Sequence, residues 1–199
     1  MYKKKYVTYL INTIKSFFYD LYYYFFEGLA QRKGAYTYSI YKSNKYYSDH
    51  IKQGAAIEGV RYLAQKYCKG KGVDIGASIW SLDGARIIED GREENAYKIL
   101  EKNNSLDYVF SSHLLEHLSD PERAFEEWSD KLKSGGVLFM YLPHPSCHMW
   151  KKENLKYHLW NPDPYYLESF FRGNCKFNIE YISYLPDGYM SFVCIVRKK

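Results

Sequence analysis

The pattern of apolar and polar positions changes near Lys69. Before that residue, apolar side chains recur at helical spacing, first as Tyr6, Leu10, Ile14, Phe17, Leu21 and Tyr24. This spacing predicts an amphipathic helix, and residues 55–67 (AAIEGVRYLAQKY) predict a second one. After Gly72, short runs of β-branched and aromatic residues alternate with helical segments. The chain therefore divides into a helical first part and an alternating second part.

The second part predicts an α/β fold. Strands are expected at Val73–Ile75, Ala85–Ile88, Tyr97–Ile99, Leu106–Ser111, Val137–Leu142, Asn178–Tyr184 and Met190–Val196. Helices are expected at Pro121–Leu132, ending at Ser134-Gly135-Gly136, and at Pro164–Phe171, because Asp120 and Asp163 are good N-cap residues. This alternation predicts a doubly wound, mainly parallel sheet. We expect a sheet domain over residues 70–199 and an N-terminal helical lid over residues 1–69.

The composition agrees with one folded domain and makes a nucleic-acid partner unexpected. At 199 residues, with 46% hydrophobic and 26% charged residues, the chain can form one α/β domain with a substantial core. Its net charge of +5 comes without a basic face of interleaved aromatics, so no nucleic-acid partner is expected. The four cysteines form no CxxC pair, which favours a reduced, cytoplasmic chain.

The N-terminal segment begins with lysines and continues with aromatic residues. Lys15, Asp20 and Glu27 interrupt it, so its uncharged runs are far shorter than the roughly 20 residues that a membrane-spanning helix needs. Two interpretations stay open. The helix packs on the domain as a lid, or residues 1–25 contact a membrane surface peripherally, with lysines facing anionic lipid.

Candidate site residues are expected directly after the predicted strands, because ligands of open α/β sheets bind beyond the carboxyl ends of the strands. The first strand leads into Asp74-Ile75-Gly76-Ala77-Ser78. Glu89 follows the second strand, fifteen residues after Asp74, close to where an acid that binds ribose is expected. The later strand at Leu106–Ser111 leads into SSHLLEHL.

These segments, in order, carry a family resemblance. The set GVDIGAS, IIED, LDYVFSSHLLEHLSDPERAFEEW and LKSGGVLFMYLP resembles the class I S-adenosylmethionine-dependent methyltransferases, in the small-molecule group with the DxGxG … LEH … LKPGG pattern. The resemblance covers about residues 70–145 and implies a Rossmann-like fold with S-adenosylmethionine as cofactor. Ser78 stands where the family has its second glycine, and the family's acid beside adenine has no evident counterpart.

The resemblance assigns a set of residues to the cofactor, namely Asp74, Gly76, Ser78, Glu89, Asn95, Ser111, Ser112 and His113. It implies that Asp74 begins the cofactor loop and that Gly76 lets the backbone approach the methionine portion. Glu89 would accept hydrogen bonds from the ribose hydroxyls, and Asn95 or Tyr97 falls near the adenine. The two serines and His113 would line the methionine end and the methyl group. Glu116 and His117 match the LEH signature as structural braces.

The implied reaction is methyl transfer to a small molecule. By family analogy we expect a hydroxyl acceptor on a saccharide or a nucleotide-linked cell-surface precursor. His144, after the fifth strand, is the favoured general base, and His113 is the second candidate. The spacing of His144, His148 and His158 does not match a helical metal pair, so no metal is expected. The alternative is a catalytically silent methyltransferase-fold protein that serves in binding or assembly.

Overall fold

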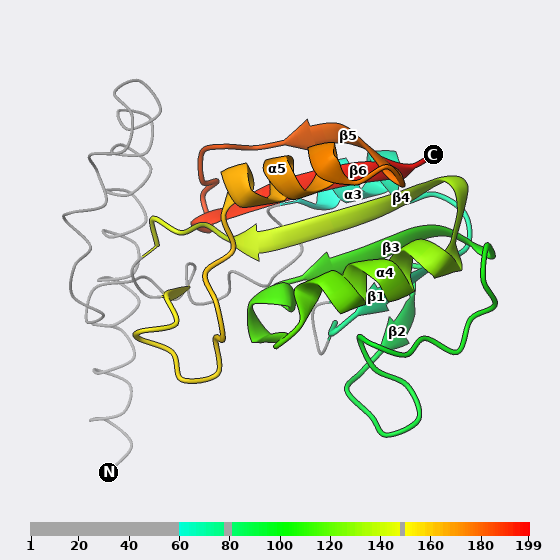
Figure 1. Cartoon of the computed structure of the whole chain (residues 1–199), viewed down its shortest axis with the longest axis horizontal. Coiled ribbons are helices and arrows are strands. Elements are labelled where there is room, and N and C mark those ends of the chain that lie inside the picture. The colour runs from blue at the N-terminus through cyan, green and yellow to red at the C-terminus, as the bar shows by residue number, and fades with distance from the viewer. Residues whose placement is uncertain (1–59, 78–80, 148–149) are drawn as a thin grey trace, which may run out of the picture.

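The computed structural model describes residues 60–77, 81–147 and 150–199 (Figure 1). The predicted helix near the N-terminus lies outside the described residues, and so does Ser78. The choice between a lid and a membrane contact for residues 1–25 therefore stays open. Within the described ranges, no helix is both long enough and apolar enough to cross a membrane.

A six-stranded sheet forms the centre of the molecule, with strand order β2-β1-β3-β4-β6-β5. The strands are β1 (Gly72–Ile75), β2 (Arg86–Ile88), β3 (Leu106–Ser112), β4 (Leu132–Pro143), β5 (Phe177–Ile182) and β6 (Ser191–Lys198). β1 pairs in parallel with β2 and β3, and β3 pairs in parallel with β4. β6 runs antiparallel between β4 and β5. The expected mainly parallel α/β sheet is confirmed, and the strand order reverses between β1 and β3, where such sheets form their binding crevices.

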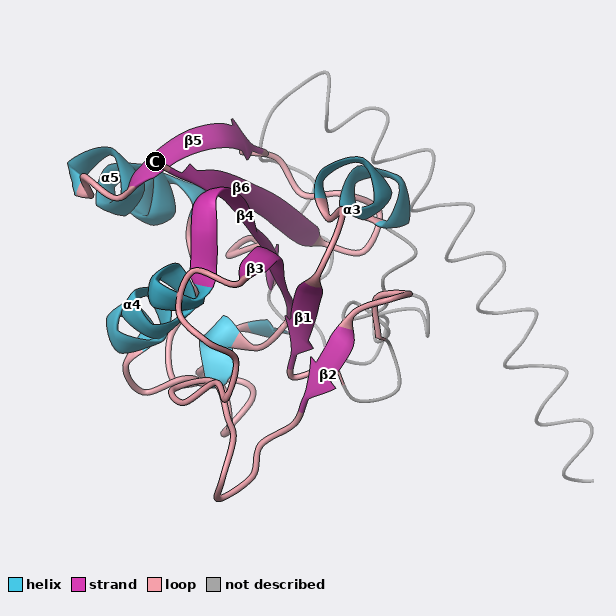
Figure 2. Ribbon diagram, turned by 90° about the vertical axis from the view of Figure 1, so that its right-hand side faces the viewer, coloured by secondary structure: helices cyan, strands magenta, loops and turns pink. Residues whose placement is uncertain are grey.

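Helices cover both faces of this sheet. α4 (Pro121–Lys131) and α5 (Pro164–Gly173) lie on one face and α3 (Arg61–Tyr67) lies on the other, as Figure 2 shows. Both predicted helix starts are confirmed. The Asp120 side chain accepts a hydrogen bond from the Arg123 N–H at 3.0 Å, and the Asp163 side chain accepts two backbone N–H groups of the first turn of α5.

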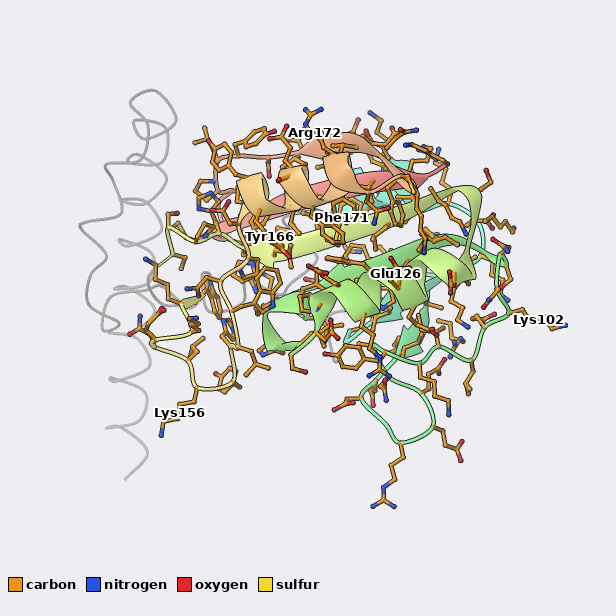
Figure 3. The ribbon with its side chains drawn as sticks, in the orientation of Figure 1. Lys102, Glu126, Lys156, Tyr166, Phe171 and Arg172 are labelled. Carbon is orange, nitrogen blue, oxygen red and sulfur yellow. The ribbon has the colours of Figure 1, made fainter. Side chains whose placement is uncertain are left out.

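An apolar cluster packs each face of the sheet. On the face of α4 and α5, the rings of Phe125 and Phe171 lie 5.2 Å apart between centroids. Figure 3 shows Phe171 between the two helices, whereas Arg172 points away from the sheet. On the opposite face, Ala64 of α3 belongs to the same cluster as Phe110 of β3. α3 therefore packs on the sheet, although it falls within the region 1–69 predicted as a lid; the boundary at residue 69 stays a prediction.

Two local predictions are wrong. Tyr97–Ile99 is not a strand, because residues 95–98 form a tight turn closed by an isolated bridge between Asn95 and Lys98. The Asn95 side chain accepts the Tyr97 N–H at 2.9 Å and so stabilises the turn over an extended segment. Ser134-Gly135-Gly136 does not end the preceding helix, which stops at Lys131. It belongs to β4, in which Gly135 has a φ of +79°.

Candidate functional site

A cavity of about 240 Å³ lies at the carboxyl ends of β1 and β2. The short 3₁₀ helix η3 (Leu115–His117), which follows β3, forms another part of its wall. The lining residues are Ile75, Gly76, Ile88, Glu89, Asp90, Asn95, Ala96, Tyr97, Leu114, His117, Leu118 and Ser119. Three of the residues predicted to bind the cofactor, Gly76, Glu89 and Asn95, thus come together around one cavity.

Gly76 is required by its backbone conformation and by its neighbour. Its φ is +78°, a region that residues with a side chain rarely adopt, and an added Cβ would stand 2.9 Å from Leu114 Cδ1. The Gly76 N–H donates a hydrogen bond of 2.8 Å to the Ile88 carbonyl. This bond ties the end of β1 to the end of β2, so that the backbone of Gly76 forms the corner of the cavity.

Glu89 is the exposed acid of the cavity wall. Within the part of the chain that the structure describes, its carboxylate has neither a hydrogen bond nor an ion pair. A carboxylate offers only acceptors, and a pair of vicinal hydroxyls offers two donors. Glu89 is therefore free to bind a diol without first breaking a contact among the described residues.

Asn95 has a different role in the wall. Its side-chain amide donates to the Gly91 carbonyl at 3.1 Å, while its carbonyl oxygen accepts from Tyr97 N–H. Both ends of the side chain therefore hold the turn that follows Glu89. Asn95 shapes the cavity next to Ala96 and Tyr97 instead of presenting a free amide to it.

Asp74 lies in β1 below the cavity and does not line it. Its Oδ2 accepts the Leu82 N–H at 2.7 Å, which folds the connection after β1 back onto the strand. Its Oδ1 has no hydrogen-bond partner among the described residues. Burial raises the pKa of Asp74 to about 7, although the bond from Leu82 lowers it. Asp74 therefore supports the loop from beneath.

Ser111, Ser112 and His113 lie at the end of β3, outside the wall of the cavity. Both serines are buried. The backbone of His113 has a φ of +47°, and its side chain is 5% exposed. Its Nε2 lies 2.8 Å from the Ser191 hydroxyl and its Nδ1 lies 3.4 Å from Glu116 Oε1. Burial lowers the pKa of His113 to about 3, so the ring is neutral at pH 7.

Glu116, predicted as a brace, lies next to His113 and His117 in a histidine cluster. It is fully buried, and neither of its carboxylate oxygens has a hydrogen-bond partner among the described residues. Burial raises its pKa to about 8. The Nε2 of His117 is 4.0 Å from Glu116 Oε1, and the His117 and His158 rings are 4.7 Å apart between centroids. Sequence spacing grouped His158 with His144, but the fold places it against His117.

His144 directly follows β4, which ends at Pro143. Its Nδ1 lies 2.6 Å from the Ser146 hydroxyl, and its Nε2 lies 3.1 Å from the Tyr184 carbonyl. Because the carbonyl can only accept, Nε2 carries the proton and Nδ1 accepts from Ser146. Burial lowers the pKa of His144, whereas the Tyr184 carbonyl raises it. Sequence reasoning missed Ser146, because nothing local marks a serine as a partner of this ring.

The comparisons agree with this geometry. Residues 55–140 match the family model described as a methyltransferase domain. Comparison with curated proteins gave no match. Among solved structures, a S-adenosylmethionine-dependent methyltransferase from Thermotoga maritima is 16% identical, with a TM-score of 0.57, covering 75% of this chain and 92% of its own. One from Aquifex aeolicus is 13% identical, with a TM-score of 0.51, covering 76% and 98%. At these identities the likeness establishes the fold.

Proposed function

We propose that this chain, in which residues 55–140 match a methyltransferase domain, is a class I S-adenosylmethionine-dependent methyltransferase that binds its cofactor in the cavity at the ends of β1 and β2. The observation that carries the proposal is the pairing of Gly76 with Glu89 on that cavity. Gly76 supplies a bare backbone corner, and Glu89 supplies an unpaired carboxylate for the ribose hydroxyls. Both stand at the crevice where strand order reverses.

The acceptor that we propose is a hydroxyl of a small molecule, in the class of saccharides or nucleotide-linked precursors. The bound cofactor supplies an electrophilic methyl group, and the chain has to position the nucleophile and remove its proton. His144 can remove this proton through Ser146. The hydroxyl of Ser146 passes its proton to Nδ1 and takes one from the acceptor, while the Tyr184 carbonyl stabilises the protonated ring through Nε2.

The aromatic side chains around the proposed acceptor favour a small ligand, and on composition we also propose a reduced, cytoplasmic setting with no nucleic-acid partner. Trp150, Tyr157 and Trp160 come from the segment after β4, and aromatic side chains provide flat walls with polar edges. Trp160 is fixed by a hydrogen bond of 2.6 Å from its Nε1 to the Leu115 carbonyl. This bond holds the aromatic segment against η3, next to the cavity.

Calorimetry with S-adenosylhomocysteine tests the proposed cofactor site. Wild-type protein is expected to bind it, and Glu89→Ala to weaken binding by about 10- to 150-fold, because hydrogen bonds to a charged group contribute about 1.5–3 kcal/mol. Gly76→Leu is expected to abolish binding. Glu93→Ala is the matched control, since Glu93 is an exposed acid of the same connection that does not line the cavity. Equal affinity in Glu89→Ala and Glu93→Ala would remove Glu89 from the site.

A catalytically silent binding protein is the second candidate. One observation favours it: the described parts of the connection between β1 and β2, within residues 76–85, contain no helix. The titration with S-adenosylhomocysteine separates the two candidates at the first step. If the wild-type protein gives no heat and no thermal shift at millimolar ligand, it does not bind the cofactor. The catalytically silent role then replaces the proposed methyl transfer.

A further inference from the structure

We propose that Glu116, His117 and His158 form a binding site for a divalent transition-metal ion of the Zn²⁺ class. Each residue offers one ligand atom, and the three atoms lie within 4.8 Å of one another. Two imidazoles and one carboxylate are a common ligand set for Zn²⁺ and leave a fourth position for water or another oxygen. The site is separate from the proposed cofactor contacts at Gly76 and Glu89.

The separations of the three ligand atoms are close enough for small side-chain movements to form a metal site. Ligand atoms of a tetrahedral Zn²⁺ site are about 2.0–2.2 Å from the ion, which places them about 3.4 Å from one another. The Nε2 of His117 and Oε1 of Glu116 are 4.0 Å apart. This pair therefore needs to close by about 0.6 Å, and no pair of ligand atoms by more than about 1.4 Å. Rotations about the side-chain bonds of Glu116 and His158 can supply such shifts.

The histidines have the outer hydrogen bonds that metal ligands use. The Nδ1 of His117 donates to the Tyr157 carbonyl at 3.0 Å, and the Nδ1 of His158 donates to the Trp150 carbonyl at 2.5 Å. A carbonyl can only accept, so these bonds place the proton on Nδ1 and leave the lone pair on Nε2. A backbone carbonyl that fixes the tautomer and the ring orientation is the usual second partner of a metal-bound histidine.

Glu116 supplies the observation that points to a cation. It is fully buried, and among the described residues neither carboxylate oxygen receives a hydrogen bond. A buried carboxyl group without partners is costly, and in proteins such groups are paired, protonated or bound to metals. Ring nitrogens of His113 and His117 lie 3.4 and 4.0 Å from Glu116 Oε1. One cation bound between Glu116, His117 and His158 would interact with the carboxylate and with the lone pairs of both rings.

Hydrogen bonds hold η3, which carries Glu116 and His117, against the segment that carries His158. The Leu159 N–H donates to the Glu116 carbonyl at 2.7 Å, and Trp160 Nε1 donates to the Leu115 carbonyl. These bonds hold the segment that carries His158 against η3. His117 also lines the cavity of about 240 Å³. A bound ion would therefore clamp the aromatic segment after β4 to the wall of the cofactor cavity.

The test is a titration of the full-length chain, stripped of metal with a chelator, with Zn²⁺ alone. We expect one ion per chain and a higher melting temperature when the metal is present, because a ligand that binds only the folded state stabilises it. Glu116→Gln and His158→Gln should each weaken binding by more than the about 10- to 100-fold that the loss of an outer-shell partner costs. Co²⁺ should give a visible spectrum of a site with nitrogen and oxygen ligands, which both variants lose.

The controls separate this site from adventitious binding. His144→Gln removes a histidine of the same segment that lies outside the triad, and Cys175→Ser removes an exposed thiol; both should bind Zn²⁺ like the wild type. Glu116→Gln keeps the shape of the buried side chain, and far-ultraviolet circular dichroism verifies its fold. No binding by the wild type overturns the proposal. Unchanged binding in folded Glu116→Gln and His158→Gln, or loss of the ion in either control, overturns it as well.

Discussion

At the scale of single residues, Asp74 couples the stability of the fold to pH. Its carboxyl group is buried in β1, and burial raises its pKa from an ordinary 3.8 to about 7. The folded chain therefore binds this proton more tightly than the unfolded chain does. Between about pH 4 and pH 7 the free energy of unfolding should fall as pH rises, and above pH 7 this contribution should level off.

Asp74→Asn should remove this dependence, because the amide keeps an acceptor for the Leu82 N–H and cannot ionise. Urea unfolding at pH 5 and pH 8 measures the effect in both proteins. The wild type should lose more stability between the two pH values than the variant, by at most about 3 kcal/mol, because about two of the three pKa units lie above pH 5. The same loss in both proteins would show that Asp74 is not protonated in the folded state at pH 5.

His144 is the residue on which the proposed chemistry depends. Once an acceptor is known, His144→Gln should leave the affinity for S-adenosylhomocysteine within a few-fold. It should reduce turnover by about 10²–10⁴-fold, the usual contribution of a general base. The ring has partners in Ser146 and Tyr184, so a fall in turnover without a fall in melting temperature distinguishes proton transfer from support of the loop. Unchanged turnover across the pH range would exclude His144 from the mechanism.

At the scale of elements, local signals predicted the helices well. α4 and α5 each begin with an aspartate whose side chain caps the helix and a proline in the first turn, and such contacts span only three residues. β1 and β3 are almost entirely buried, and β4 is a continuous apolar run from Val137 to Leu142, as expected of central strands in a parallel sheet. Tyr97–Ile99 has the composition of a strand but not a partner in the sheet. The side chain of Asn95 decides its structure instead.

The sequence could predict only those site residues that directly follow neighbouring parallel strands. Gly76 and Glu89 end neighbouring parallel strands, so the sequence places both at one edge of the sheet. The cluster of Glu116, His117 and His158 depends on how the segment after β4 folds back on η3. No spacing in the sequence encodes that return. The Ser146 contact of His144 was missed because nothing local marks it.

At the scale of the whole molecule, a second cavity lined by described residues competes with the first as the cofactor site. The larger one, of about 700 Å³, lies between α3 and the edge formed by β5 and β6. Its lining includes Val60 and Leu63 together with residues 181–187, and the acid among them, Asp187, already bonds to the Tyr141 hydroxyl at 2.5 Å. The smaller cavity has an unpaired acid and the glycine corner at the reversal of strand order. We assign the cofactor to the smaller cavity on chemistry and position, not on size.

Hydrogen–deuterium exchange of the full-length chain, with and without S-adenosylhomocysteine, tests this assignment most directly. The cofactor should protect backbone amides in residues 75–76, 88–90, 95–97, 114 and 117–119, which line the smaller cavity. Residues 181–187 should exchange at the same rate in both samples. Protection confined to residues 181–187, or no protection anywhere at saturating ligand, would contradict the proposed cofactor site.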